Sequence, residues 1–372
     1  MKRQLLGVAA ILLSISTYAQ DNPLWMRYCA ISPDGTTIAF TYKGDIYTVP
    51  STGGRASQIT TNPAHDTKPI WSPDGKKIAF ASDRMGSMDI FEVNKEGGIP
   101  KRLTTHSGNE TPVAYKDAGH ILFLANIMPT AEDAQFPSGQ FQQVYEVNTE
   151  GGRPILFSSM PMEDISINHT GNTLLYHDKK GYEDPWRKHH TSSITRDIWL
   201  CSLNGNRTFR KQTAFNGEDR TPVWASDDKS FYYLSEEKGS FNIFKRDIDG
   251  NTSKQITNHT KHPVRFLSAA SNGTLCYGYD GEIYTVKEGA IPQKVQISIV
   301  TDKNDKDLIR QIKRNGATEI SLSPDAKEIA FVLRGDVYVT STEYSTTKQI
   351  TNTPQQERDI HFSPDGRSIV YA

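Results

Sequence analysis

The chain has 372 residues, of which 36% are hydrophobic and 23% are charged. This is enough apolar material for a sizeable core, and it excludes a disordered or fibrous protein. Lys and Arg number 42 against 43 Asp and Glu, so a formal charge of -1 gives no global field that would attract nucleic acid or an anionic membrane.

The amino terminus has the parts of a secretory signal peptide. Lys2 and Arg3 precede an apolar run, Leu5 to Ile15, that is too short to span a bilayer, and small Ala19 follows. We therefore predict a signal peptide over residues 1–19, cleaved after Ala19, and a periplasmic or secreted mature protein. No later apolar run is long enough to cross a membrane.

The stretch WSPDGKKIAF, residues 71–80, is typical of a strand, a tight turn and a second strand, and close copies start near residues 32, 323 and 363. Proline presets φ at the first corner of the turn, aspartate can bond the local backbone, and glycine accepts the left-handed position. An apolar triplet follows each of eight such turns: 38–40, 78–80, 121–123, 174–176, 231–233, 275–277, 329–331 and 369–371.

A second signature follows the first seven triplets. It is a polar residue, a β-branched residue and an aromatic one, as in Asp45-Ile46-Tyr47, and it predicts a third strand. Segments such as Gln58-Ile59-Thr60 predict a fourth strand in most copies. Aspartates that open third strands, Asp45, Asp89, Asp197 and Asp336, could line a channel, but a repeated position favours a role in the scaffold.

Four-stranded units at a period of about 40 residues indicate β-propeller blades. We predict an all-β fold with a six-bladed β-propeller of four-stranded blades over residues 20–297. Residues 298–316, dense in charge, are predicted to be a connector between domains. Residues 317–372 then predict the first blade and a half of a second propeller, which we interpret as truncated after two strands of the eighth copy.

The connection over residues 178–196 of blade four is long and rich in aromatic and basic side chains. Because loops commonly carry binding surfaces, we predict peptide binding by Trp186, Arg187, His189 and His190. The alternative is a solvated polar loop packed on its own propeller. Adjacent histidines in a strand would point to opposite faces, which disfavours a metal site.

The sequence has no motif of a catalytic centre. A nucleophile elbow, a zinc-protease helix and a phosphate-binding glycine loop are all missing from the chain. Cys29, Cys201 and Cys276 are widely spaced in apolar stretches, which favours buried thiols over disulfides or zinc ligands. We expect no catalytic residue, no metal and no cofactor on this chain.

The blades resemble those of TolB-like and tricorn-type propellers, which share the Ser-Pro-Asp-Gly turn, the apolar-aromatic strand and the aspartate-led third strand. The order of parts is similar to that of secreted bacterial tricorn-like serine peptidases. In that family a charged connector leads to a second propeller, as SLSPDAKEIAFVLRGDVYV does at residues 321–339. The resemblance implies a propeller that gates or channels peptides, and a later peptidase domain with the serine nucleophile.

Three functions are therefore weighed. The first is a non-catalytic propeller region that gates or scaffolds peptide substrates for a downstream peptidase domain. The second is a stand-alone TolB-like periplasmic protein-binding propeller, although the TolB-like family has an α/β domain ahead of its blades. The third is a propeller of the prolyl-oligopeptidase type, which the break after six copies disfavours. The expected partners are peptides or unfolded protein segments and the downstream peptidase domain, and self-association to a homo-oligomer is left open.

Overall fold

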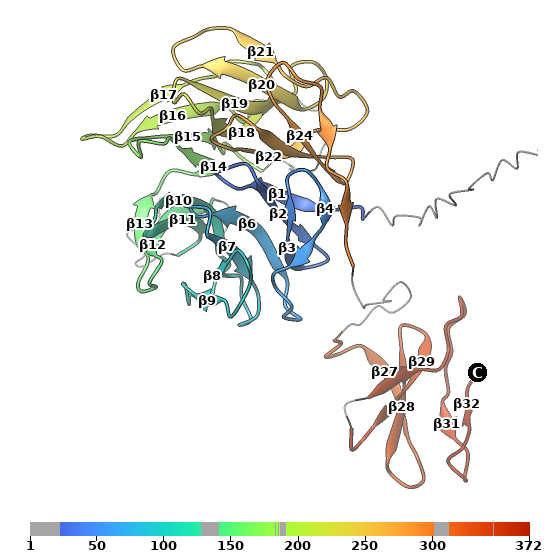
Figure 1. Cartoon of the computed structure of the whole chain (residues 1–372). Helices are drawn as coiled ribbons and strands as arrows, with labels where there is room; N and C mark the ends of the chain where they lie inside the picture. Colours follow the sequence, from blue (N-terminus) through green and yellow to red (C-terminus); the bar gives the residue numbers. More distant parts are fainter. Residues whose placement is uncertain are drawn as a thin grey trace, which may run out of the picture. The chain divides into compact units, whose positions relative to one another are not determined.

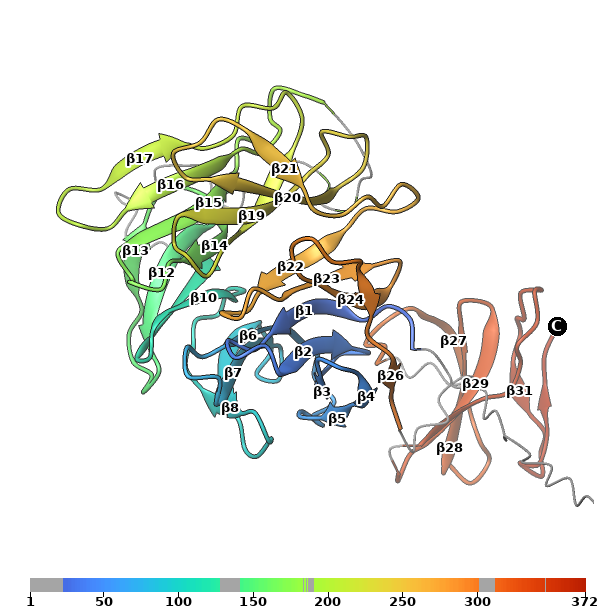
Figure 2. The ribbon, with the colours of Figure 1, turned by 45° about the horizontal axis from the view of Figure 1, so that its top comes forward.

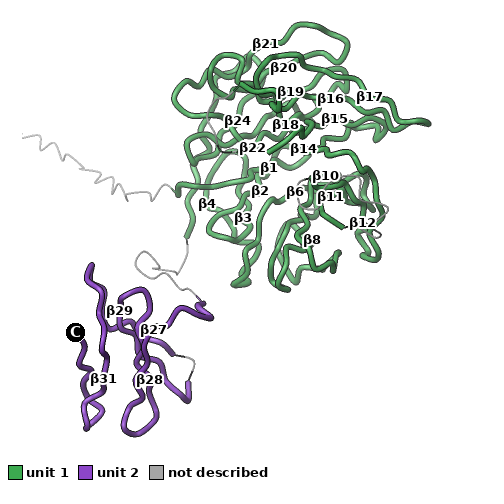
Figure 3. The backbone as a smooth tube through the Cα atoms, turned by 180° about the vertical axis from the view of Figure 1, so that it is seen from behind, with its two compact units in different colours: residues 1–300 green, residues 301–372 purple. Residues whose placement is uncertain are grey.

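The computed structural model describes residues 23–127, 141–182, 184, 186, 191–300, 312–344 and 346–372. Strands and turns make up these residues without any helix, which confirms the all-β prediction. Accordingly, the described chain contains no helix that could cross a membrane. The chain divides into two compact units, residues 1–300 and 301–372, which Figure 3 colours separately.

In unit 1, the described residues form six four-stranded sheets, each antiparallel and in chain order from its first strand. Sheets one and two contain β1 (Arg27–Ile31), β2 (Thr37–Tyr42), β3 (Asp45–Pro50), β5 (Ser57–Gln58), and β6 (Asp66–Trp71), β7 (Lys77–Ser82), β8 (Asp89–Asn94), β9 (Lys101–Arg102). Sheets three and four contain β10 (Thr111–Asp117), β11 (His120–Ala125), β12 (Gln143–Asn148), β13 (Ile155–Ser158), and β14 (Met162–Ile167), β15 (Thr173–Asp178), β16 (Ile198–Ser202), β17 (Thr208–Lys211). Sheets five and six contain β18 (Asp219–Trp224), β19 (Ser230–Ser235), β20 (Asn242–Asp247), β21 (Ser253–Gln255), and β22 (Arg265–Ala269), β23 (Leu275–Tyr279), β24 (Glu282–Val286), β25 (Gln293–Lys294).

The turn between β6 and β7 shows why the repeated motif forms a hairpin. The Ser72 hydroxyl donates to Asp74 Oδ1 at 2.7 Å and accepts the Lys77 amide at 2.9 Å, while Asp74 Oδ1 accepts the Lys76 amide at 3.1 Å. Gly75 closes the turn at a φ of 67°. The Ser72 hydroxyl, followed by the Lys76 amide, lowers the pKa of Asp74. The same serine and aspartate bonds hold the turns that begin at Ser32, Ser323 and Ser363.

Two side chains of the fourth-strand segment tie it to the third strand. In sheet one the Thr60 hydroxyl accepts the Ile46 amide at 2.9 Å, and Gln58 Nε2 donates to Asp45 at 3.0 Å. Threonines at the matching positions of other sheets do the same: Thr104 to Ile90, Thr213 to Ile198 and Thr257 to Ile243. Asp89 pairs with Arg102 and Asp197 with Lys211, each at 2.8 Å. The repeated aspartates therefore join neighbouring strands, which is a structural role.

The apolar triplets explain how the sheets pack face to face. Ile78 and Phe80 of β7 lie in a core cluster with sheet one, whereas Ala79 lies in the next cluster with sheet three. Successive strand residues point to opposite faces, so the two large residues fill one interface and the small one leaves room in the other. Six such clusters each join two neighbouring sheets, including sheets six and one.

The first strand of each sheet lies towards the middle of unit 1, and β9, β13, β17 and β21 lie at its periphery (Figure 1). Contacts between first strands run from β1 through β6, β10, β14 and β18 to β22, and β22 in turn contacts β1. Figure 2 shows β22 beside β1, although the two strands come from opposite ends of the unit.

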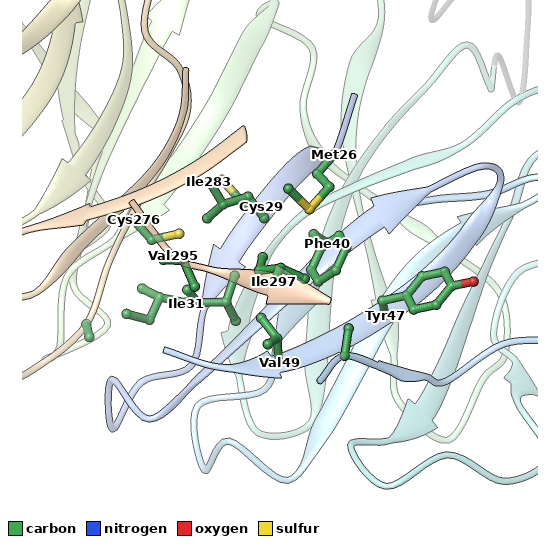
Figure 4. Close-up of a cluster of buried hydrophobic side chains, with 13 residues drawn as sticks. Met26, Cys29, Ile31, Phe40, Tyr47, Val49, Cys276, Ile283, Val295 and Ile297 are labelled. Carbon is green, nitrogen blue, oxygen red and sulfur yellow. The ribbon is translucent and has the colours of Figure 1, made fainter. Parts of the chain in front are cut away.

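The join between sheets one and six has an extra element. Strand β26 (Ile297–Ser298) pairs in parallel with β4 (Gly54–Arg55), so the chain returns to its start after sheet six. Figure 4 shows the core at this join, where Cys29 and Phe40 of sheet one face Cys276 and Ile283 of sheet six. Ile297 contributes to the same core and is 2% exposed.

Unit 2 contains one four-stranded sheet and a hairpin in its described residues. The strands are β27 (Ala317–Leu322), β28 (Glu328–Leu333), β29 (Asp336–Ser341) and β30 (Thr347–Gln349), then β31 (His361–Phe362) and β32 (Ile369–Val370). Its core is small, built around Ala330, Val332, Val337 and Ile360. Residues 301–311, most of the predicted connector, lie outside the described part of the chain.

Candidate functional site on the inner strands

Each first strand of unit 1 contains a β-bulge, and in five of the six a residue with positive φ follows the start of the bulge. We call these the bulge residues: Tyr28, Lys68, Asp164, Thr221 and Phe266, with φ between 47° and 58°. A left-handed conformation costs a non-glycine residue about 1 kcal/mol. Its recurrence at one position of the repeat indicates that the bulge serves to re-aim side chains.

The bulge residues of different sheets contact one another. The rings of Tyr28 and Phe266 lie 4.8 Å apart between centroids, and Lys68 Nζ lies 5.7 Å from the Tyr28 ring centroid. On sheets four and five, the Thr221 hydroxyl donates to Asp164 Oδ2 at 2.6 Å. Burial lowers the pKa of Lys68, whereas the charge of Asp164 acts to raise it. The bulges thus bring side chains from sheets one, two, four, five and six into one neighbourhood.

Glu163, on the acidic side of this neighbourhood, has several basic partners. Glu163, which directly precedes a bulge residue, accepts from Lys179 Nζ at 2.7 Å and contacts His177 Nε2 at 3.2 Å. Arg196 Nε lies 3.5 Å away, and Arg196 Nη1 also donates to buried Glu218 at 2.8 Å. Burial raises the pKa of Glu163, but the hydrogen bonds and charges of His177 and Lys179 outweigh it, so that the pKa is lowered.

Sheets one and six carry arginines where sheet four carries a glutamate. Arg27 and Arg265 directly precede the bulge residues of β1 and β22, and their guanidinium carbons lie 4.9 and 5.0 Å from the centroid of the Trp186 ring. Arg265 Nη2 also donates to the Trp186 carbonyl at 2.8 Å, and the Trp186 ring meets Phe266 edge-on at 6.1 Å. Trp186 of the blade-four connection therefore lies against arginines of both sheet one and sheet six, and it is 44% exposed.

The structure thus places one of the four predicted peptide-binding residues. Trp186 lies beside the bulge residues, whereas Arg187, His189 and His190 lie outside the described residues, so peptide binding by this set stays a prediction. Sequence reasoning missed the arginines and the bulge residues. The available signal was a pair of polar or bulky residues near the start of the five first strands that have a bulge residue, such as Glu163-Asp164, which breaks the expected alternation.

The side chains at this site are charged or aromatic, and the described residues provide neither a cluster of metal ligands nor an exposed cysteine. Among the described residues, no group of three or more His, Cys, Asp or Glu side chains is placed to hold a metal ion. The three cysteines are free and buried, and Cys29 and Cys276 share the core between sheets one and six. Such groups can bind a ligand through charge-assisted hydrogen bonds and contacts with aromatic rings.

Comparison with known proteins identifies the family. The family model of the tricorn protease N-terminal β-propeller domain matches residues 23–290, which is most of the chain. The chain belongs to this tricorn family. The tricorn assignment confirms the resemblance drawn from the sequence, and it makes unit 1 a β-propeller domain.

Individual tricorn relatives agree with this. "Tricorn protease homolog 1" of Streptomyces coelicolor is 25% identical over 94% of this chain and 32% of its own length. "Tricorn protease homolog" of Saccharolobus solfataricus is 27% identical over 76% of this chain and 26% of its own length. The crystal structure of the tricorn protease covers 92% of this chain with a TM-score of 0.64 at 19% identity, which shows the shared fold. The chain spans about a third or less of these tricorn relatives.

Proposed function

We propose that this chain is the non-catalytic propeller region of a tricorn-like serine peptidase and that it gates or scaffolds peptide substrates. The six sheets of unit 1 would be the blades of one closed propeller over residues 20–297, after a signal peptide of residues 1–19. Residues 298–316 would be a connector, and residues 317–372 would open a second propeller. We further propose that the protein is exported to the periplasm or secreted.

The observation that supports this proposal most strongly is the contact between the first strands of the sheets, which are the inner strands of unit 1. First strands of all six sheets contact one another in order, and their bulges gather charged and aromatic side chains in the middle of unit 1. A polypeptide that passed along this middle would meet Lys68, Asp164 and Trp186 from different sheets. Such a lining suits the passage of varied peptide sequences better than the tight recognition of one small molecule.

Exposed apolar residues on β27 of unit 2 support the proposal that another sheet packs against this strand. Cys29 and Ile31 of β1 are each 4% exposed because sheet six covers them. The matching residues of β27, Ile320 and Leu322, are 75% and 57% exposed. We propose that this face packs against a later blade of the same second propeller, and that the downstream peptidase domain follows it in the parent protein.

The intact mass and the peptidase activity of the protein from its source cells test this proposal. We expect a mass several-fold above the 41.6 kDa of this chain, together with peptide hydrolysis that a serine-directed reagent abolishes. A mass of 41.6 kDa less the signal peptide, without hydrolysis, would overturn the peptidase assignment and favour a binding propeller.

Gating is tested by narrowing the middle of unit 1 in the same full-length protein. The substitution Thr221→Trp places a large side chain beside Asp164, whereas Thr61→Trp places one at an exposed position as a control. We expect Thr221→Trp to slow hydrolysis of long unfolded polypeptides much more than that of short fluorogenic peptides. Equal slowing of both substrate classes would argue against a gate.

A further inference from the structure

Two of the three cysteines lie at the join between sheets one and six. Cys29 is on β1 and Cys276 on β23, and these two strands contact each other. Their side chains are 4% and 0% exposed and belong to the core that Figure 4 shows. Cys201 of β16 lies in a different core, between sheets three and four. Separation along the sequence favoured free thiols, but the fold brings Cys29 and Cys276 together.

Hydrogen bonds show how closely these two cysteines approach. The Ser268 hydroxyl lies 3.4 Å from the carbonyl oxygen of Cys29 and 3.4 Å from that of Cys276. The Cys29 thiol reaches across to sheet six, where it donates to the Phe266 carbonyl at 3.5 Å. Burial raises the pKa of Cys276, and a hydrogen bond with the Cys29 thiol raises it further. Thiols in such contact are within reach of the S–S bond of about 2.05 Å that oxidation forms.

We propose that Cys29 and Cys276 form a disulfide when the protein folds under oxidising conditions, and that this bond links the last sheet of unit 1 to the first. The inference goes beyond the proposed function, since it needs neither a peptide nor a peptidase domain. Only the formation of the bond in the cell rests on the proposed export, because disulfides persist outside the reducing cytoplasm. The bond would reinforce the join that the pairing of β26 with β4 also holds.

The bond forms by thiol–disulfide exchange, and the oxidant is the disulfide of an oxidoreductase or of oxidised glutathione. One cysteine thiolate attacks a sulfur of the oxidant to give a mixed disulfide, and the other cysteine then attacks the protein sulfur of that mixed disulfide. One S–S bond forms in the protein and one breaks in the oxidant, which gains two electrons and two protons and leaves as two thiols. The thiolate is the attacking form, and Cys276 is fully buried in the folded protein. We therefore expect the exchange to take place before sheet six has docked on sheet one.

Counting free thiols after refolding tests the pair. The purified chain is unfolded with reductant and then refolded either in a mixture of oxidised and reduced glutathione or with dithiothreitol alone. Each product is denatured and alkylated with N-ethylmaleimide, and its intact mass is measured. We expect one alkylated cysteine, Cys201, after refolding with glutathione, and all three after refolding with dithiothreitol. Peptide mapping without reduction should find Cys29 linked to Cys276.

Two alanine variants locate the bond. Cys29→Ala should leave Cys276 and Cys201 alkylated after either treatment, whereas the matched control Cys201→Ala should leave no alkylated cysteine after refolding with glutathione. Because the disulfide closes a loop that contains most of unit 1, the unsubstituted chain should melt roughly 5–10 °C higher after refolding with glutathione than with dithiothreitol. The melting temperature of Cys29→Ala should be the same after both treatments.

Three alkylated cysteines after refolding with glutathione would overturn the proposal, as would a disulfide that includes Cys201. Equal melting temperatures of the two forms of the unsubstituted chain would overturn the role of the bond in the join. The thiol count uses the unsubstituted chain, so it stays decisive even where a variant fails to fold. The same mapping on protein alkylated directly in its source cells tests the export separately. A bond that forms on refolding but not in the cells would contradict the proposed export and leave the cysteine pair standing.

Discussion

Buried carboxyl groups with a raised pKa make the stability of this protein depend on pH. Glu110 precedes β10 and is fully buried. Burial raises the pKa of Glu110 to about 7; the Thr104 hydroxyl opposes the shift and the nearby charge of Asp89 adds to it. Because the folded state holds the proton more tightly, stability from Glu110 is present below the unfolded pKa and is lost as pH rises to about 7.

We expect Glu110→Gln to stabilise the protein at pH 8 by about 2 kcal/mol, since glutamine resembles the protonated acid and cannot ionise. At pH 4.5 the two proteins should have nearly the same free energy of unfolding. Chemical denaturation at both pH values measures this, with Glu96→Gln at an exposed position as the control. A stabilisation that is equal at pH 4.5 and pH 8 would contradict the linkage.

The second strand of each sheet is the element that spaces the blades. Its triplet places large side chains against the preceding sheet and the middle residue against the next one, as Ile78, Ala79 and Phe80 do. In sheets three and four the middle residue is Leu122 or Leu175, so the room at this position differs from one interface to another. Each interface is therefore fitted to its own pair of sheets.

Ala79 is fully buried between sheets two and three. We expect Ala79→Leu to lower the free energy of unfolding by about 1–3 kcal/mol, because a well-packed interface has no room for three more carbons. Ala290→Leu, on an exposed turn after β24, is the matched control and should change stability little. An equal effect of the two substitutions would show that the triplet does not set the spacing between sheets.

The two ends of unit 1 are joined through a glycine. Gly53 has a φ of 92°, and a Cβ built there would lie 2.6 Å from the carbonyl oxygen of Gln296. Next to it, the Gly54 amide donates to this same oxygen at 2.8 Å, and the Ala56 amide donates to Ser298 O at 2.9 Å. These bonds, with the core in Figure 4, hold sheet six to sheet one.

Gly53→Ala should therefore weaken this join. Gly97 of sheet two has nearly the same φ, 93°, but its nearest Cβ contact is the carbonyl oxygen of Ile59 at 3.6 Å. An alanine at either position bears about 1 kcal/mol of strain from the left-handed backbone. Only at position 53 does the added Cβ also clash with the Gln296 carbonyl. Only Gly53→Ala should therefore speed hydrogen exchange at the Gly54 and Ala56 amides. Unchanged exchange at these two amides in Gly53→Ala would contradict a join that depends on this close approach.

Much of the fold could be predicted because its causes are local in the chain. The turn motif is held by hydrogen bonds between Ser72, Asp74 and Lys77. The aspartate that opens a third strand bonds to a residue about 13 positions away, as Asp45 does to Gln58. These contacts fix hairpins and strand order, which is why the repeat identified the fold class. One difference among the turns is Ala326, which occupies with a φ of 59° the left-handed position that Gly35, Gly75 and Gly366 hold in the other copies of the motif.

The sequence by itself determined the four-stranded repeat and its turns, and so the kind of fold, because residues close in the chain interact whatever lies further away. Only the tertiary structure decided the site. Arg27 and Arg265 reach Trp186 from sheets at opposite ends of unit 1, and β26 returns to β4 across the same join. These contacts depend on how the sheets are arranged in space. A bulge breaks the alternation of a strand locally, but the break does not show which strands of other sheets the displaced side chain will contact.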